Sequence, residues 1–240
     1  KSEKIWMDGK FVPWQDANVH VLTHTLHYGL GVFEGIRCYQ IKSKKSAVFR
    51  LQEHINRLFK TAIVLSIEIP FSKKEIHTAI LQVVKKNKLD ECYIRPIVFL
   101  GHNQMGLNPN GVDVRAAIAA WPWGAYLGDD GINNGIRVRI SSFTRHHVNI
   151  TMTRAKACGY YVNSILAKAE AVRDGYDESI LLDPQGYVSE GSGENIFLLS
   201  KGRLKTPTLS CSNLEGITRD SVFDIAKHLK IEIEEGFITR

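Results

Sequence analysis

The stretch Glu190-Gly191-Ser192-Gly193-Glu194-Asn195-Ile196-Phe197 carries the most information about the fold of this chain. The glycines on either side of Ser192 allow the backbone to approach another group closely. This is typical of a ligand-binding loop, although an ordinary β-turn is the commoner explanation. The spacing is Gly-Ser-Gly and not Gly-x-Ser-x-Gly, so the sequence does not support the nucleophile elbow of a serine hydrolase.

A second segment, Leu214-Glu215-Gly216-Ile217-Thr218-Arg219-Asp220, follows downstream. It places Gly-Ile-Thr at the start of a helix predicted over 218–229, where free N–H groups and the positive end of the helix dipole favour an anion. Simple N-capping by Thr218 is the alternative. Arg57, at the far end of a helix predicted over 51–66, is either a second phosphate ligand or an exposed helix residue.

Lys156 is the candidate nucleophile upstream of these segments. It lies in Thr153-Arg154-Ala155-Lys156-Ala157-Cys158-Gly159-Tyr160-Tyr161, a run of small and aromatic residues in which a long cation needs a partner. A lysine in such a pocket is available as an amine for a Schiff base. The alternative is an ordinary surface lysine.

The first half of the chain predicts a mixture of strands and two helices. Asp8-Gly9 between short apolar segments predicts an N-terminal hairpin over residues 5–12. Apolar spacing predicts the helix over 51–66, and the capping pair Ser72 and Glu75 opens a second helix that runs to Val84. The strands expected in this half cover 33–39, 47–50, 92–100 and 114–121.

Residues 123–135 alternate Gly with Asp and Asn, which predicts a loop or an interdomain linker. We therefore expect a small domain over 1–122 and a larger one over 136–240. The elements expected in the second domain are a strand over 136–143, a helix over 163–173, a hairpin over 179–189, a strand over 195–199, the helix over 218–229 and a strand over 231–235.

The composition is that of an ordinary globular protein. The chain has 240 residues, of which 44% are hydrophobic and 23% are charged, and this excludes collagen, coiled-coil and disordered classes. No apolar run approaches the ~18 residues of a membrane span, and the first ten residues lack the apolar core of a signal peptide, so we expect a cytoplasmic protein without membrane contact. The net charge of +6 comes from short lysine clusters typical of solvated faces, which disfavours nucleic-acid binding.

Metal and nucleotide sites are not indicated. His20, His24 and His27 lie where Thr23, Thr25 and a Tyr-Gly break disfavour a helix, and no carboxylate or cysteine completes a ligand set, so we interpret them as structural. The glycines at 29, 31 and 35 fit neither the Gly-x-Gly-x-x-Gly nor the Gly-x-x-x-x-Gly-Lys-Ser/Thr spacing of nucleotide-binding loops. The four cysteines lie far apart with no Cys-x-x-Cys, which predicts free thiols.

Taken together, these segments resemble the fold-type IV, pyridoxal-phosphate-dependent aminotransferases. Every element of that signature occurs in order, as Glu190 to Phe197, Leu204-Lys205-Thr206 and Leu214 to Arg219. Three further segments resemble the bacterial branched-chain amino acid aminotransferases: His24 to Arg37, Tyr93-Ile94-Arg95-Pro96 and Pro122 to Gly128. The resemblance covers essentially the whole chain. It implies a mixed α/β, two-domain fold with a smaller N-terminal α/β domain and a larger C-terminal pseudo-barrel domain.

The resemblance implies that pyridoxal 5'-phosphate is the cofactor. Lys156 would hold it as a Schiff base and move a proton between substrate and cofactor carbon atoms. Glu190 would pair with the pyridinium nitrogen, and Tyr161 would hydrogen-bond the phenolic oxygen of the ring. The other cofactor-binding residues that it implies are Arg57, Ile217 and Thr218 at the phosphate and Leu214 against the ring face.

The resemblance also implies the reaction, in which L-leucine, L-isoleucine or L-valine gives its amino group to 2-oxoglutarate to form L-glutamate. Arg95 would meet the γ-carboxylate of glutamate or 2-oxoglutarate, because apolar walls cannot hold a second carboxylate. Gly35 would leave room for the branched side chain. The other substrate-binding residues that it implies are Tyr28, Phe33, Arg37, Tyr93, Trp123, Tyr126 and Tyr161.

Tyr93 and Met105-Gly106-Leu107 resemble segments that reach the neighbouring subunit's site in the family, so we expect a homo-oligomer, either a dimer or a dimer-based hexamer. The family has a further C-terminal segment with a small-residue loop at the phosphate, so we expect the second domain to be truncated at Arg240. Three alternatives stay open: a D-amino acid aminotransferase or an aminodeoxychorismate lyase on the same fold, and a cofactor-binding protein without activity.

Overall fold

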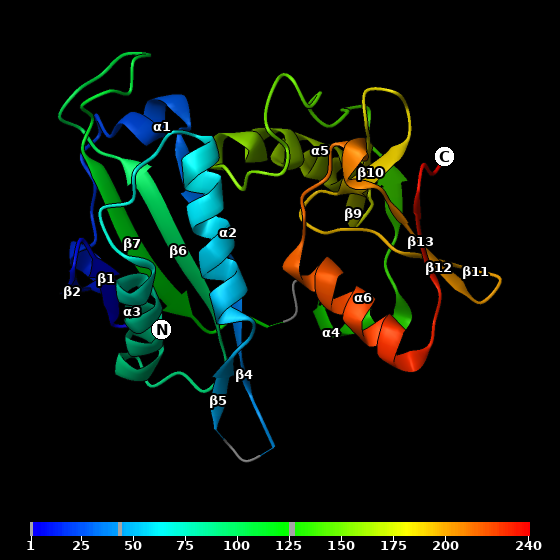
Figure 1. Ribbon diagram of the computed structural model, residues 1–240, viewed down its shortest axis with the longest axis horizontal. Coiled ribbons are helices and arrows are strands. Elements are labelled where there is room, and N and C mark those ends of the chain that lie inside the picture. The colour runs from blue at the N-terminus through cyan, green and yellow to red at the C-terminus, as the bar shows by residue number, and fades with distance from the viewer. Residues whose placement is uncertain (1, 43–44, 125–127) are drawn as a thin grey trace. The chain divides into compact units, whose positions relative to one another are not determined.

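The computed structural model describes residues 2–42, 45–124 and 128–240 and divides the chain into two compact units, which are drawn in Figure 1. The first unit comprises Lys1–Tyr126 with Ala155–Gly159, and the second comprises Leu127–Arg154 with Tyr160–Arg240. The segment Ala155–Gly159 thus belongs to the first unit although its neighbours on both sides belong to the second. Lys156 lies in this segment.

The first unit is built on a seven-stranded sheet in which β2-β1-β7-β6-β4-β5 is the strand order and β3 also pairs with β6. Its strands are β1 (Lys4–Met7), β2 (Lys10–Pro13), β3 (Gly31–Phe33), β4 (Ile36–Gln40), β5 (Ser46–Val48), β6 (Cys92–Leu100) and β7 (Val114–Trp121). Its helices are α1 (His24–Tyr28), α2 (Leu51–Val64) and α3 (Lys73–Lys86), and a 3-10 turn spans Trp14–Asp16.

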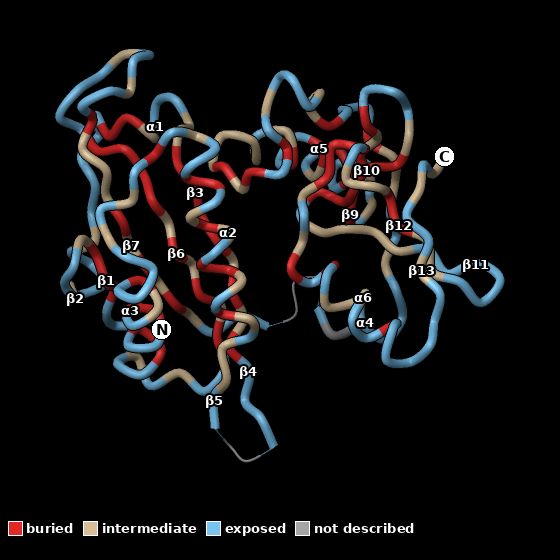
Figure 2. Tube along the Cα trace, in the orientation of Figure 1, coloured by how far each residue is buried: buried red, intermediate tan, exposed pale blue. Residues whose placement is uncertain are grey.

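The core of the first unit lies between this sheet and helices α2 and α3. Side chains alternate along β6, so Ile94 and Val98 are buried in this core while Arg95 belongs to the other face of the strand. Ile55 of α2 and Ile80 of α3 are at most 1% exposed and pack into the same cluster. Figure 2 shows the buried trace along β6 and α2. The sheet face opposite the helices carries Arg95 together with Ile97 and Phe99 of the same strand.

Several local signals of the first unit are confirmed, but the strand expected over 33–39 is divided at Glu34 and Gly35 into β3 and β4. The hairpin at Asp8-Gly9 pairs Met7 with Lys10. Ser72 caps α3 through a reciprocal box in which Glu75 N donates to the Ser72 hydroxyl and Ser72 N donates to the Glu75 carboxylate. The strands over 92–100 and 114–121 are β6 and β7.

The segment around His24 is helical, so the prediction that it is not a helix is wrong. Helix α1 ends where Gly29 adopts the left-handed conformation at φ 73°. The Tyr28-Gly29 break therefore terminates a short helix and does not prevent one. Burial of His24, whose Nε2 lies 2.8 Å from the Gly106 carbonyl oxygen, anchors this helix against weak local propensity.

The second unit contains two three-stranded sheets, β10-β9-β8 and β11-β12-β13. Its strands are β8 (Val138–Ile140), β9 (Glu178–Leu182), β10 (Val188–Gly191), β11 (Leu198–Ser200), β12 (Arg203–Pro207) and β13 (Ile233–Gly236). Its helices are α4 (Gly128–Asn134), α5 (Tyr161–Arg173) and α6 (Ile217–Leu229), and a 3-10 turn spans Leu209–Cys211. Another 3-10 turn, Cys158–Tyr160, lies where the chain passes from the first unit to the second. The predicted hairpin over 179–189 and the predicted helices over 163–173 and 218–229 are confirmed.

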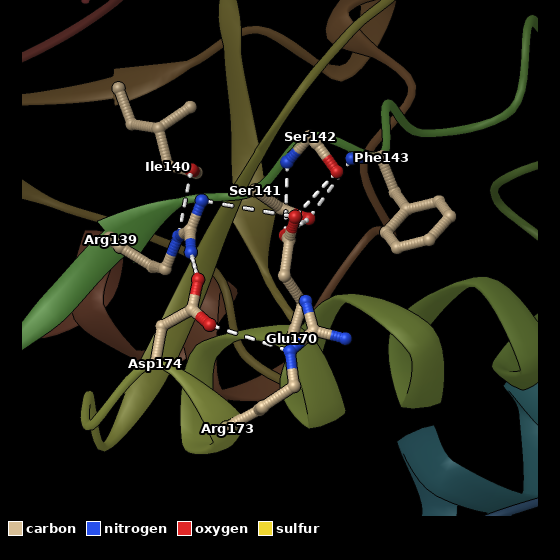
Figure 3. Close-up of polar contacts among 8 residues, drawn as sticks. All are labelled: Arg139, Ile140, Ser141, Ser142, Phe143, Glu170, Arg173 and Asp174. Carbon is tan, nitrogen blue, oxygen red and sulfur yellow. Dashed lines mark hydrogen bonds and ion pairs between the residues drawn. The ribbon is translucent and has the colours of Figure 1, made fainter.

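Helix α5 is fixed to the end of β8 by a buried carboxylate. Glu170 accepts hydrogen bonds from the Ser141 hydroxyl at 2.7 Å and from the Ser142 backbone N–H at 3.0 Å, as Figure 3 shows. The Ser142 hydroxyl also donates to it. Hydrogen bonds from Ser142 and Ser141 lower the pKa of Glu170 to about 2. The helix that begins at Tyr161 is thereby held on the β8–β9 pair.

Three expectations for the second unit need correction. Residues 128–134 of the predicted linker form α4, in which Asn134 donates to the Asp130 carboxylate four residues earlier. The strand expected from Asn195 begins only at Leu198, because the Asn195 amide donates to the Leu214 carbonyl oxygen. Strand β12, which pairs with both β11 and β13, was missed.

Two further findings concern the chain as a whole. None of the helices in the described residues combines the length and the apolar character that crossing a membrane requires. All four cysteines are free thiols, of which Cys38, Cys92 and Cys211 are buried.

Candidate active site

The segment that carries Lys156 is held on the first unit by backbone contacts. Phe33 N donates to the Lys156 carbonyl oxygen at 3.2 Å, and Gly159 N donates to the Gly29 carbonyl oxygen at 3.0 Å. A Cβ on Gly29 would lie 2.9 Å from the Cα of Gly159. Since real Cβ atoms do not approach this closely, glycine at position 29 permits the contact. Lys156 is therefore fixed at the end of β3.

The Lys156 side chain is half-buried and lies against an aromatic ring. Its Nζ is 5.1 Å from the centroid of the Phe33 ring, and its backbone N donates to the Thr61 hydroxyl at 3.3 Å. Ala155 and Ala157, on either side, are buried. A primary amine that is flanked by small buried residues and lies next to an aromatic ring is suited to nucleophilic attack on a carbonyl carbon.

Arg57 is part of a buried charged cluster, so the alternative of an exposed helix residue is wrong. Its Nε donates to Glu34 Oε1 at 2.7 Å and its Nη2 donates to Glu34 Oε2 at 2.8 Å. His54 Nδ1 lies 2.7 Å from the same Oε2. Burial raises the pKa of Glu34, but the hydrogen bonds from Arg57 and His54 outweigh it and lower this pKa to about 2. The Glu34 carboxylate is thus ionised throughout the physiological range.

Arg95 lies on the sheet face away from the helices among aromatic rings. Its Nη2 donates to the Tyr93 hydroxyl at 3.0 Å, and its Cζ is 4.6 Å from the Phe33 ring centroid. Its Nε is buried and has no hydrogen-bond partner among the described residues. Leaving a guanidinium N–H buried and unpaired costs free energy, which a carboxylate ligand would recover.

Gly35 makes room for Tyr93. A Cβ at position 35 would lie 2.0 Å from the Tyr93 hydroxyl oxygen, so no side chain fits there while Tyr93 holds its place. In this structure the Tyr93 hydroxyl occupies the space next to Gly35, and the role of Gly35 in the substrate pocket stays a prediction. Through Tyr93, Gly35 also affects where Arg95 lies.

The remaining substrate candidates of the first unit are aromatic side chains and Arg37. The Trp123 ring is 4.7 Å from the Tyr93 ring, and Arg37 Nη1 donates to the Trp123 carbonyl oxygen at 2.7 Å. Arg37 therefore holds the Trp123 backbone. Tyr28 is 44% exposed at the end of α1. Tyr126 lies outside the described residues.

In the second unit, Glu190 is buried and ion-paired. Its Oε1 is 2.9 Å from Arg145 Nη2, and its Oε2 accepts a hydrogen bond from Leu214 N at 3.0 Å. Arg145 is itself buried and donates from Nη1 to Asn163 and to Ser164 of α5. These contacts hold the Glu190 carboxylate in one orientation.

Helix α6 begins at Ile217 with Gly216 as its N-cap, so the alternative that Thr218 caps this helix is wrong. No side-chain hydrogen bond caps the helix. A Cβ on Gly216 would lie 2.0 Å from the Asn195 side-chain oxygen, so this turn requires glycine. A helix start that lacks a side-chain cap and carries the positive end of the dipole fits an anionic group such as a phosphate.

Tyr161 and Leu214 complete the predicted set in the second unit. Tyr161 is the first residue of α5 and is half-buried. Leu214 is joined to Glu190 through its backbone N–H. Next to it, Arg154 pairs with Glu215 at 2.5 Å. The structure therefore brings Glu190, Leu214 and the start of α6 together within this unit.

The histidines singled out in the sequence make hydrogen bonds to the protein backbone. His27 Nε2 lies 2.8 Å from the Val21 carbonyl oxygen, and His20 Nδ1 accepts from Leu22 N at 3.1 Å. Within the part of the chain that the structure describes, no three histidine, cysteine or acidic residues form a group that could hold a metal ion.

Three polar residues that support the predicted site residues were missed from the sequence. Glu34 pairs with Arg57, His54 contacts Glu34, and Arg145 pairs with Glu190. Glu34 had a usable signal, since it is an acidic residue between the apolar Val32-Phe33 and Ile36 in a region predicted as strand. Arg145 and His54 carry no comparable signal, because polar neighbours are common at a strand end and on a helix.

Comparison with known proteins gives a consistent result. The family model described as amino-transferase class IV matches residues 31–240. A branched-chain-amino-acid aminotransferase of Pseudomonas aeruginosa is 52% identical over 236 residues, which are 98% of this chain and 76% of that protein.

Two solved structures of branched-chain amino acid aminotransferases are also similar. The enzyme from Escherichia coli has a TM-score of 0.98 at 46% identity, covering 100% of this chain and 79% of that one. The enzyme from Thermobaculum terrenum, solved in its PLP form, has a TM-score of 0.92 at 31% identity, covering 100% and 78%. The predicted resemblance and the mixed α/β fold are confirmed. This chain therefore belongs to the class IV aminotransferases, in the family of the branched-chain amino acid aminotransferases.

Proposed function

We propose that this chain transfers the amino group of L-leucine, L-isoleucine or L-valine to 2-oxoglutarate, with pyridoxal 5'-phosphate as cofactor. The observation that carries the proposal is Arg95, whose buried Nε has no hydrogen-bond partner in the described part of the chain and whose guanidinium lies beside Phe33 and Tyr93. The two substrates differ in their side chains, one apolar and one a carboxylate. Aromatic walls suit the first, and a single guanidinium among them suits the second.

Family membership supports the cofactor assignment, and so does the relative solved in its PLP form. The residues of each unit fit the group: the first has the Lys156 amine and the Arg57 guanidinium, and the second has the Glu190 carboxylate, paired with Arg145, and the start of α6. When bound, pyridoxal phosphate supplies an electron sink for the bonds at the α carbon of the substrate.

Each residue then has a defined task. Lys156 Nζ would hold the cofactor covalently and, when free, would move the proton at the substrate's α carbon. Glu190, oriented by Arg145, would accept a hydrogen bond from the pyridinium N–H. Tyr161 would donate a hydrogen bond to the phenolic oxygen.

The phosphate and substrate ligands follow the same reasoning. Arg57 and the N–H groups of Ile217 and Thr218 bind the phosphate, and Leu214 packs on the ring. Arg95 binds the γ-carboxylate of glutamate or 2-oxoglutarate. The other substrate-pocket residues proposed are Tyr28, Phe33, Arg37, Tyr93, Trp123, Tyr126 and Tyr161.

The test is the visible absorption of the purified chain supplied with pyridoxal phosphate. The band of the covalently bound cofactor should appear, bleach on addition of L-leucine and return with 2-oxoglutarate. Lys156→Ala should lack the band and the activity, whereas Lys74→Ala, at an exposed position of α3, should keep both. Bleaching by D-alanine alone would move the chain to its D-specific relatives. A band that no amino acid bleaches would leave a cofactor-binding protein without activity.

We further propose a homo-oligomer built on the first unit. Val21, Leu26 and Leu107 are 72%, 64% and 87% exposed, and Leu26 borders a hollow of about 250 Å³ with mostly apolar walls. Exposed apolar surface of this kind is typical of protein interfaces. Sedimentation of the purified chain at micromolar concentration tests the proposal, and a single monomeric species would contradict it. A cytoplasmic location and the division into domains over 1–122 and 136–240 stay predictions.

A further inference from the structure

Glu34 is the most completely buried carboxylate in the described part of the first unit and is not among the proposed ligands. Its side chain is 1% exposed, in the turn between β3 and β4, and its backbone N donates to the Pro96 carbonyl oxygen at 2.9 Å. Three nitrogen atoms converge on the two carboxylate oxygens, at 2.7 to 2.8 Å: Arg57 Nε, Arg57 Nη2 and His54 Nδ1. The position of the carboxylate is therefore fixed from several sides.

The geometry of the pair fixes the plane of the guanidinium. A guanidinium has five N–H groups in a rigid fork, and the pair with Glu34 uses one on Nε and one on Nη2. Two parallel bonds prevent rotation of Arg57 about its last side-chain bonds, which a single bond would allow.

A buried ion pair of this kind contributes little to the free energy of unfolding. The desolvation of both charges offsets most of their attraction, and apolar residues of similar volume often stabilise a core equally well. The ionised carboxylate, whose pKa is about 2, keeps the pair intact over the whole working range of pH. What the pair does provide is one fixed orientation for the arginine.

We infer that Glu34 is a positioning residue of the cofactor-phosphate site, which acts by holding the Arg57 guanidinium in one orientation, with His54 bracing the carboxylate. This inference rests on the function proposed above, in which Arg57 binds the phosphate. Glu34 itself does not touch the cofactor, so its contribution is confined to the recognition of the phosphate group.

The test compares two probes that differ only in that group, pyridoxal 5'-phosphate and pyridoxal, on the full chain freed of cofactor. The variant Glu34→Asp keeps the charge but withdraws the carboxylate by one methylene, so that it can no longer span both guanidinium nitrogens. We expect the preference for pyridoxal phosphate over pyridoxal to fall by about tenfold or more, with the affinity for pyridoxal nearly unchanged, because charge-assisted bidentate pairs depend strongly on geometry.

Glu53→Asp is the matched control. Glu53 lies on α2, the helix that carries Arg57, and pairs with Arg50 at 2.9 Å, but its side chain is 44% exposed. It should leave both affinities unchanged. His54→Asn, which removes one contact and leaves the bidentate pair, should lower the same preference by a smaller factor. The His54→Asn variant therefore tests the inference even if Glu34→Asp does not fold.

A double-mutant cycle with Arg57→Gln separates positioning from general damage to the fold. If Glu34 acts through Arg57, then Glu34→Asp has no further effect on the preference once Arg57 is replaced. An undiminished preference in Glu34→Asp, or an equal additional loss in the Arg57→Gln background, overturns the inference. If the parent chain itself binds the two probes equally, the proposed phosphate role of Arg57 fails, and the inference fails with it.

Discussion

Replacing Gly35 by alanine should damage the use of 2-oxoglutarate much more than the use of leucine. The added Cβ would lie 2.0 Å from the Tyr93 hydroxyl oxygen, whereas real Cβ contacts are essentially never below 3.0 Å. The Tyr93 hydroxyl must therefore move by at least about 1 Å, because the Tyr93 side chain can shift more easily than the backbone at position 35. A shift of this size breaks its 3.0 Å hydrogen bond with Arg95 Nη2.

The expected size follows from that bond. A hydrogen bond to a charged group contributes about 1.5–3 kcal/mol, and each 1.4 kcal/mol is a factor of ten. We therefore expect kcat/KM for 2-oxoglutarate to fall about 10- to 150-fold. An apolar side chain does not use the guanidinium, so kcat/KM for leucine should fall by no more than about threefold.

The assay measures kcat/KM for each substrate with the other one saturating. In an exchange reaction of two half-steps, each of these constants reports its own half-reaction. Gly124→Ala is the control, because a Cβ at that position meets no atom of the described residues within 4 Å. Its two constants should equal those of the parent chain.

Equal losses for leucine and 2-oxoglutarate in Gly35→Ala would refute the reasoning, since they would indicate a general disturbance of the pocket. So would an unchanged variant whose crystal structure shows Tyr93 in its original place.

Two further predictions concern stability. Burial and the neighbouring Glu178 carboxylate raise the pKa of Glu194 from 4.5 to about 7, so folding stability is lost as pH rises between these values. Glu194→Gln should therefore raise the urea midpoint of unfolding clearly at pH 8 and little near pH 4.5. The opposite pH dependence would contradict this cause. Ile80→Ala, at a fully buried position of α3, should lower the free energy of unfolding by about 2–5 kcal/mol. Ile63→Ala, at a position 76% exposed on α2, should change it by about 0.5 kcal/mol or less, and similar losses in both variants would disprove the assignment of the core.

Local structure was largely predictable from the sequence. The Asp8-Gly9 turn, the capping box of Ser72 and Glu75 and strands β6 and β7 are found where short-range patterns place them. These features depend on hydrogen bonds and side-chain periods within a few residues, so neighbouring residues suffice to specify them. Helices α1 and α4 were missed, because both contain glycine or polar residues of weak helix propensity.

The sequence by itself determined the family, because the signature around Glu190 and Leu214 is a set of residue types at fixed spacing. It also identified Lys156, Arg57 and Arg95 as candidates. It did not show that Lys156 belongs to the first unit or that Glu34 pairs with Arg57.

Only the tertiary structure decided those points, together with the finding that Tyr93 fills the space above Gly35. The hydrogen bond between Arg57 and Glu34 joins residues 23 positions apart, and the one between Lys156 and Thr61 joins residues 95 positions apart. Burial and ion pairing depend on which distant segments the folded chain brings together, and no local pattern of residues records that.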